Sequence, residues 1–123
     1  MNLGSNVNFF LGLQSQLRVF HWQTKGYARH IAFGETYDAL DDLIDSYVEA
    51  CMGKHGRFVL SEGEKSLQLM NLSEVRPDGM VKTCIEVLES FSDELEPKDT
   101  DLLNLRDEMI QQLNRLNYLL TLE

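Results

Sequence analysis

The sequence has few of the residues that interrupt helices or crosslink chains, with 2 prolines and 2 cysteines among its 123 residues. Pro77 and Pro97 both stand where a helical pattern begins, so neither breaks a helix. Cys51 and Cys84 are far apart and form no Cys-x-x-Cys pair. This spacing favours small buried thiols in a reducing compartment over a zinc site or a disulfide scaffold.

Long apolar runs are also absent. The N-terminal stretch "MNLGSNVNFFLGLQSQLRVF" has no basic segment, and polar residues interrupt its apolar ones. Such a stretch is typical of neither a signal peptide nor a membrane span. We therefore expect a cytoplasmic protein with no membrane partner.

Positive charge is scarce, since 11 Lys and Arg face 20 Asp and Glu, which gives a net charge of -9. The summed field of such a chain repels phosphate groups, and no lysine-rich tail offsets it. DNA binding is therefore not expected.

Several catalytic motifs are missing from the sequence. It contains no glycine-rich phosphate loop, no nucleophile elbow, no His-Glu-x-x-His and no Glu-x-x-His. A di-iron centre built inside one helical bundle needs two Glu-x-x-His pairs and two further inward glutamates. A di-iron centre of this type within a single subunit is therefore excluded by ligand count.

Helical periodicity, in contrast, is present throughout most of the chain. Apolar residues recur at intervals of three and four, as they do on the buried side of an amphipathic helix. The first stripe comprises Leu3, Val7, Phe10, Leu13, Leu17 and Phe20, and Gly26 follows it. The second comprises Phe33, Tyr37, Leu40, Ile44, Tyr47 and Cys51, and Gly53 and Gly56 close this helix of roughly 24 residues.

Two further stripes follow a less regular connection at residues 57–77. The third comprises Met80, Cys84, Val87, Phe91 and Leu95, and the fourth comprises Leu102, Leu105, Met109, Leu113, Leu116 and Leu120. Residues 1–123 are long enough for one core and too short for two. The sequence thus predicts a single all-α domain, a ferritin-like four-helix bundle with one long crossover between helices two and three.

Four carboxylates recur along the second helix at intervals of four, three and four: Asp38, Asp42, Asp45 and Glu49. Asp45 and Glu49 lie about 130–170° from the apolar stripe of their own helix, so they face water or another subunit. Two interpretations are open. The residues form a solvated acidic face, or a divalent cation relieves their repulsion.

The histidines could supply nitrogen ligands to such a cation. His21 falls about 40° from the middle of the first stripe, and Trp22 points away from that stripe. An exposed tryptophan at a helix end needs a partner surface. His30 opens the second helix between its apolar and acidic faces. His21 is either a ligand or a core-edge histidine hydrogen-bonded to the backbone, and His30 is either a ligand or a polar residue at the helix start. His55 is interpreted as a surface residue.

The segment "LRVFHWQTKGYARHIAFGETYDALDDLIDSYVEA" resembles the signature of the Dps group, the miniferritins. In that signature a His-Trp pair ends the first helix, a glycine follows, and the second helix carries a His, a Tyr and an Asp-x-x-x-Glu. The matching residues are His21, Trp22, Gly26, His30, Phe33, Tyr37, Asp45 and Glu49. In its short length the chain looks most like the small Dps-like proteins of phages and large DNA viruses.

The resemblance implies an iron site shared between two subunits of a homo-oligomer that is at least a dimer. His21 and His30 of one protomer would meet Asp45 and Glu49 of its partner, with Trp22 packed at the interface. The expected ligand is ferrous iron, for which zinc or manganese could substitute. The activity that the resemblance implies is that of a ferroxidase, in which oxygen or peroxide oxidises the bound iron.

The chain departs from the family pattern at two positions. The family usually has a carboxylate one helical turn after the second histidine, where this chain has Gly34, and an arginine after the final glutamate, where it has Ala50. Two hypotheses follow: an iron-binding miniferritin, or a ferritin-like structural or interaction module that has lost the metal chemistry. The sequence leaves the metal, the oxidant and the choice between a dimer and a cage open.

Overall fold

The computed structural model describes residues 2–122, which form four α-helices and no β-strand. The helices are α1 (Leu3–Gln23), α2 (Tyr27–His55), α3 (Pro77–Ser90) and α4 (Thr100–Leu119). Three short 3-10 helices accompany them, namely η1 (Glu62–Glu64), η2 (Leu72–Glu74) and η3 (Phe91–Asp93). The all-helical prediction is confirmed.

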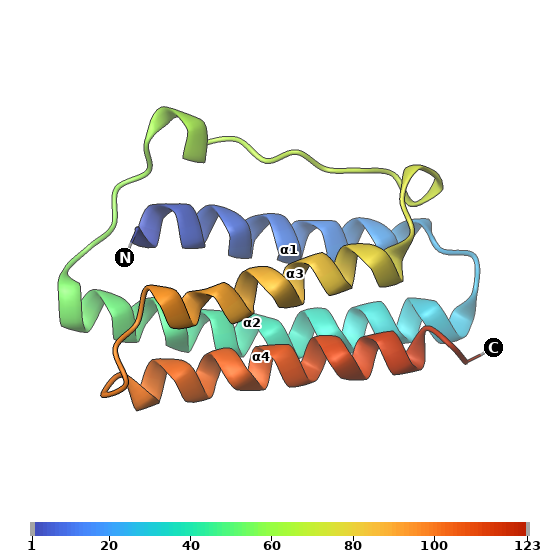
Figure 1. The fold of residues 1–123 in the computed structure, drawn as a ribbon. Helices are drawn as coiled ribbons and strands as arrows, with labels where there is room; N and C mark the ends of the chain where they lie inside the picture. Colours follow the sequence, from blue (N-terminus) through green and yellow to red (C-terminus); the bar gives the residue numbers. More distant parts are fainter. Residues whose placement is uncertain (1, 123) are drawn as a thin grey trace.

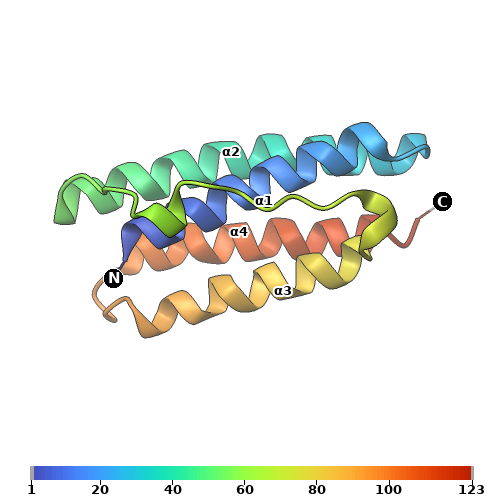
Figure 2. The same ribbon diagram turned by 90° about the horizontal axis from the view of Figure 1, so that it is seen from above.

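The four long helices lie side by side as a bundle (Figures 1 and 2). Helix α1 packs on α2, α2 packs on α4, and α3 packs on α4. Helices α2 and α3 run in the same direction, so residues 56–76 have to return along the bundle between them. The expected long crossover is therefore present, and it runs beside α1 (Figure 2).

Amide side chains on the outer side of α1 hold this crossover. Asn8 Nδ2 donates to two carbonyl oxygens of the crossover, each 2.9 Å away. Gln16 both donates to the Met70 carbonyl and accepts from the Met70 amide, at 2.8 Å in each case. Gln23 Oε1 accepts from the Leu72 amide at 2.8 Å. These bonds satisfy backbone groups of a segment that has little regular structure of its own.

The core lies between the helices and contains a cluster of aromatic rings from α1, α2 and η3. The rings of Phe10, Tyr47 and Phe91 meet with centroids 5.5–5.8 Å apart. Every residue of the first predicted stripe is buried. In α2, Tyr37 is only half-buried, and Thr36 is buried in its place with its hydroxyl bonded to the Ala32 carbonyl.

Helix α2 is longer than the sequence pattern predicted. It has 29 residues, because it begins at Tyr27, directly after the Gly26 N-cap. Apolar periodicity begins only at Phe33, so the first turn carried no hydrophobic signal. His30 consequently lies within the first turn of α2, and its amide donates to the Gly26 carbonyl.

The third stripe is confirmed at Phe91 and Leu95, which are buried, but its earlier residues were placed about one residue off. The structure buries Val81 and Leu88 fully, whereas Met80, Cys84 and Val87 are half-buried. Helix α3 packs against α4 on one side, and Met80 and Cys84 line a cavity against the crossover on the other. The apolar pattern of the sequence does not show which α3 residues face α4 and which face the crossover.

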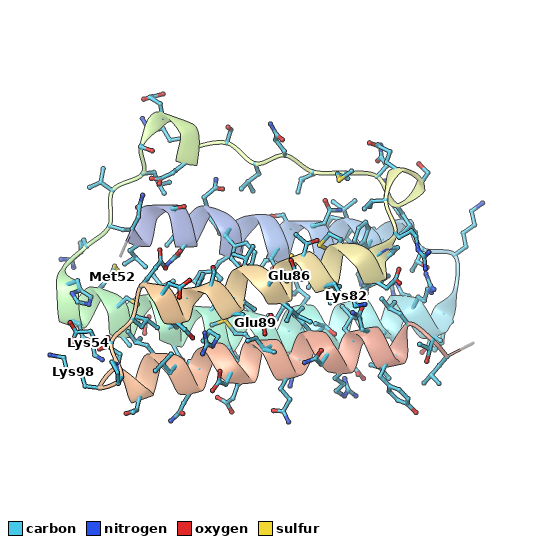
Figure 3. The ribbon with its side chains drawn as sticks, in the orientation of Figure 1. Met52, Lys54, Lys82, Glu86, Glu89 and Lys98 are labelled. Atoms are coloured by element: carbon cyan, nitrogen blue, oxygen red, sulfur yellow. The ribbon has the colours of Figure 1, made fainter. Side chains whose placement is uncertain are left out.

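A charged cluster joins the far end of α2 to the start of α4 (Figure 3). Lys54 Nζ lies 3.1 Å from Asp99 and 2.6 Å from Asp101. The hydrogen bond from Lys54 lowers the pKa of the Asp101 carboxyl.

Among residues 2–122, no helix combines the length and apolar character that crossing a bilayer requires.

Candidate functional site

The turn between α1 and α2 brings the two candidate histidines together. Helix α1 ends at Gln23 and α2 begins at Tyr27, so His21 and His30 face each other across a very short connection. His21 Nδ1 lies 2.6 Å from the His30 carbonyl oxygen, and His30 Nδ1 lies 2.8 Å from the His21 carbonyl oxygen. A carbonyl oxygen can only accept, so both Nδ1 atoms carry the proton and donate.

This pair of hydrogen bonds determines the tautomer of both rings. With the proton on Nδ1, the lone pair of a neutral imidazole is on Nε2, which is the atom left for a metal ion. The rings of His21 and His30 are stacked, with centroids 3.8 Å apart and planes 17° from parallel. Each lone pair lies in its own ring plane, so in this arrangement the two nitrogens cannot converge on one ion.

Gly34 accounts for how closely the His21 ring approaches α2. A Cβ atom at position 34 would lie 2.9 Å from His21 Cε1 and 3.0 Å from His21 Nδ1. Gly34 has no positive φ, so the close approach alone requires glycine here. The His21 ring therefore occupies the space next to α2 into which a side chain at position 34 would project.

The candidate carboxylates lie far from the histidines of the same chain. Asp45 and Glu49 are exposed on the surface of α2, as the helical wheel predicted. Fifteen residues of α-helix separate His30 from Asp45, which corresponds to about 22 Å. Within residues 2–122 of one chain, no three His, Cys, Asp or Glu side chains are placed to hold a metal ion.

The outer surface along which α1 and α2 meet extends from the candidate histidines towards the candidate carboxylates. Arg18 of α1 lies over the Tyr37 ring of α2, with its guanidinium carbon 3.9 Å from the ring centroid, and 5.7 Å from the Trp22 centroid. Further along, Gln14 donates to Asp41 at 3.0 Å. We call this outward-facing surface, from Trp22 to Asp45, the seam. The Arg18–Tyr37 contact depends on the spacing of two helices, so the sequence did not reveal it.

The two cysteines do not add ligands to this surface. Cys51 is buried and Cys84 is half-buried, and both are free thiols. Burial raises the pKa of each thiol to about 11. Both thiols therefore stay protonated near neutral pH. Because the thiolate is the form that binds metals, neither side chain is a ligand there.

Comparison with known proteins gives a family and a phage relative. Residues 21–120 match DUF5856, a family of unknown function. Over 57 residues the chain is 39% identical to an uncharacterised 14.6 kDa protein encoded in the mobD-ri intergenic region of Enterobacteria phage T4. That alignment covers 43% of this chain and 44% of the phage protein.

No solved structure matches the chain. The phage relative agrees with the expected likeness to small phage proteins, whereas neither match carries a ferritin-like description. The chain spans less than half of the phage protein in this alignment. The family match includes both histidines and both carboxylates of the candidate site.

Proposed function

The chain belongs to DUF5856, and we propose that it is a Dps-like miniferritin that binds ferrous iron between two copies. The reciprocal hydrogen bonds of His21 and His30 carry this proposal, because they leave both Nε2 atoms as free ligands. Asp45 and Glu49, which are exposed on the same helix, would complete the site from the partner subunit.

The donor set suits the proposed substrate. Imidazole nitrogens and carboxylate oxygens together bind ferrous iron, manganese and zinc. The hydrogen bonds at Nδ1 also fix the ring orientation, as such outer contacts do in known metal sites. The two carboxylates would offset the charge of the bound cations.

A two-fold axis perpendicular to α2 can unite the separated residues. If this axis crosses α2 between Asp38 and Ala39, it places His30 of one copy close to the positions of Asp45 and Glu49 of the partner subunit along the helix axis. The same operation generates two equivalent sites, one at each end of the paired helices. The distance of about 22 Å within a chain is thus compatible with ligands that meet between chains.

The stacked rings also support a particular iron stoichiometry. Parallel imidazoles 3.8 Å apart offer one nitrogen to each of two ions. Two ferrous ions supply the two electrons that reduce one hydrogen peroxide to water, with two protons taken up and two ferric ions formed. A shared site with two histidines therefore fits oxidation by peroxide, and we propose ferroxidase activity on this basis.

The ferritin-like assignment is supported by connectivity. Helices α2 and α3 run in the same direction, and the crossover at residues 56–76 joins them. Bundles with one long crossover of this type include the ferritin-like folds. Gly34, which stands where the resemblance expects a carboxylate, makes room for the His21 ring.

Anaerobic calorimetric titration with ferrous and zinc ions tests the proposal. The unmodified protein should bind, and the double variant Asp45→Asn/Glu49→Gln should lose roughly 100-fold or more in affinity. A matched control is Glu86→Gln/Glu89→Gln, which removes two exposed charges from α3 (Figure 3) and should bind normally. Titration of the unmodified protein with no heat beyond dilution would refute the proposal.

The second candidate function is a structural or interaction module, which the exposed Trp22 favours. Melting curves of the same variants separate the two. If the acidic face is only solvated, Asp45→Asn/Glu49→Gln stabilises the protein by relieving repulsion, and metal stabilises neither form. If the site binds metal, ferrous or zinc ions raise the melting temperature of the unmodified protein alone.

A further inference from the structure

A cavity opens at the end of the bundle where α2 and α3 begin and α4 ends (Figure 1). Its volume is about 370 Å³, which lies in the range of about 300–1,000 Å³ that is typical of small-molecule pockets. Its charged lining comprises Arg29 of α2, Arg76 directly before α3, and Asp78 and Lys82 of α3. The lining includes none of the four candidate iron ligands, so this cavity is separate from the site of the proposed function.

Positive charge gathers in this cavity, although the chain as a whole is acidic. Three of the lining side chains are cationic and one is a carboxylate, which leaves an excess of two positive charges. The whole chain, in contrast, has a net charge of -9. A cleft lined mainly by one sign of charge attracts ligands of the opposite sign, so the lining suits a small anion.

Asp78 neutralises only one of the three cations. Arg76 donates to the Asp78 carboxylate from Nη2 at 3.2 Å and from Nε at 3.4 Å. Among residues 2–122, neither Arg29 nor Lys82 forms a salt bridge. Lys82 is exposed on the N-terminal half of α3 (Figure 3). Two positive charges of the cavity therefore have no carboxylate partner in the part of the chain that the structure describes.

The Arg29 side chain is held in place by the end of α4. It is half-buried, and its Nη2 donates to the Leu120 carbonyl at 3.2 Å. A guanidinium carries five N–H donors in a planar group, and this bond uses one of them. Because the bond already restricts the side chain, Arg29 loses less conformational freedom when its other donors bind an anion.

The start of α3 adds to the positive potential of the cavity. The first N–H groups of a helix have no acceptor within the helix, and the helix dipole favours negative charge beside them. Arg76 is the N-cap residue, and its side chain forms no capping hydrogen bond. Asp78 lies in the first turn of α3, so the chain itself already places one negative charge at this helix end.

The size and the surroundings of the cavity favour a small phosphate compound over a polymer. A phosphate group carries about 1.5–2 negative charges and several strong acceptor oxygens, which match guanidinium and ammonium donors. A nucleic acid would extend beyond the cavity and over a protein with a net charge of -9, which repels its other phosphates. A small anion meets only the positive lining.

We propose that this cavity binds the phosphate group of free phosphate or of a small phosphomonoester. Arg29 and Lys82 donate to the phosphate oxygens from two different helices. Arg76 joins them when it exchanges the Asp78 carboxylate for the ligand. Asp78 thus competes with the ligand, and its charge limits the affinity of the cavity.

Titration of the metal-free protein with inorganic phosphate, followed by the amide chemical shifts in two-dimensional NMR spectra, tests this proposal. The amide signals at the start of α3 and around Arg29 should shift and saturate, with a dissociation constant in the millimolar range or lower. Arg29→Gln/Lys82→Gln should weaken binding by roughly 10-fold or more. The matched control Lys65→Gln/Arg115→Gln removes two positive charges outside the cavity and should change the affinity by less than roughly 2-fold.

Asp78→Asn tests the cavity by a gain of binding. The substitution removes the competing charge and releases Arg76, whereas the amide oxygen of asparagine still accepts hydrogen bonds at a helix start. Phosphate affinity should rise by roughly 3-fold or more. This variant keeps the bond between Arg29 and the Leu120 carbonyl, so it tests the proposal even if loss of that bond disturbs the fold of the double variant.

A parallel titration with glycerol 3-phosphate distinguishes the two sources of the phosphate group. Tighter binding of glycerol 3-phosphate than of inorganic phosphate indicates a phosphomonoester, and the reverse order indicates free phosphate. Shifts that never saturate, or that spread over the whole surface, would overturn the proposal. Equal losses in the cavity variant and its control would do the same, as would unchanged or weaker binding by Asp78→Asn.

Discussion

The two hairpins of the bundle differ in where their histidines and their buried arginine lie. In α1–α2, reciprocal bonds of His21 and His30 close the turn, and Trp22 and two carboxylates are exposed on the surface. In α3–α4, the corresponding polar residue turns inward, since Arg106 is 8% exposed. The α1–α2 hairpin therefore carries the candidate ligands of the proposed metal site, while the α3–α4 hairpin holds a charged side chain inside the bundle.

Arg106 closes the C-terminal end of α3. Its Nη1 donates to the Leu88 carbonyl at 3.0 Å, to the Glu89 carbonyl at 3.3 Å and to the Ser92 hydroxyl at 2.9 Å. The Phe91 N–H also donates to these two carbonyls at the end of α3, and the guanidinium from α4 gives them a second, charged donor. Its Nε also donates to Asp107 at 2.8 Å.

The largest expected effect on stability comes from replacing the buried Arg106 of the α3–α4 hairpin. Arg106→Met should lower the free energy of unfolding by about 1.5–3 kcal/mol, because it removes the hydrogen bonds of a charged donor to the Leu88 and Glu89 carbonyls and to the Ser92 hydroxyl. Urea unfolding measures the change. Zinc binding by the fraction that remains folded should be unaltered, since the candidate ligands lie on the other hairpin.

Arg115→Met is the matched control on the same helix. Arg115 pairs with Glu35 at 3.5 Å, and both side chains are at least half exposed, so its loss should change stability by less than about 1 kcal/mol. Equal losses for the two arginines would show that Arg106 does not stabilise the end of α3 as described.

The position of Arg106 also shows what the sequence could predict. Periodicity gave Leu102, Met109, Leu113 and Leu116 correctly as core residues of α4. It placed Leu105 inward, although Leu105 is half-buried and its neighbour Arg106 is buried. The partners of Arg106 belong to another helix, so no local pattern indicates that this charge has hydrogen-bond acceptors inside.

The next prediction concerns the α1–α2 hairpin and the contact of Gly34 with the His21 ring. Gly34→Ala should destabilise the protein by about 1–3 kcal/mol, because its Cβ forces the His21 ring away. Metal affinity should fall with it, since the displaced ring loses its bond to the His30 carbonyl. Thermal unfolding and zinc titration measure the two effects.

Gly53→Ala provides the control within the same helix. A Cβ at Gly53 meets nothing within 4 Å, so this change should stabilise α2 by up to about 1 kcal/mol. A stabilising Gly34→Ala with unchanged zinc affinity would mean that the His21 ring does not require glycine beneath it.

At the candidate site, the role of Gly34 could not be predicted from the sequence. The resemblance identified His21, His30, Asp45 and Glu49 as residues to consider, and periodicity placed the carboxylates outward. An absent carboxylate at position 34 looked like a lost ligand. The stacked rings and their approach to the α2 backbone depend on the turn geometry, which residue spacing does not encode.

The smallest effect concerns Tyr47, where the two hairpins meet. Its ring packs against Phe10 of α1 and Phe91 beyond α3, but its hydroxyl is buried without a hydrogen-bond partner among residues 2–122. Burial raises its pKa, and the nearby Cys51 thiol adds to the shift. The hydroxyl therefore stays neutral and contributes no hydrogen bond to either hairpin.

Tyr47→Phe should consequently raise the free energy of unfolding by about 1 kcal/mol, because it removes an unsatisfied polar group and keeps the ring. The control Tyr118→Phe alters an exposed residue and should change stability by less than about 0.5 kcal/mol. A clear loss of stability in Tyr47→Phe would instead indicate that the Cys51 thiol acts as its partner. In that case Tyr47 would join Thr36 as a second buried polar side chain of α2 with a hydrogen-bond partner, and the contrast between the two hairpins would not extend to the core side of this helix.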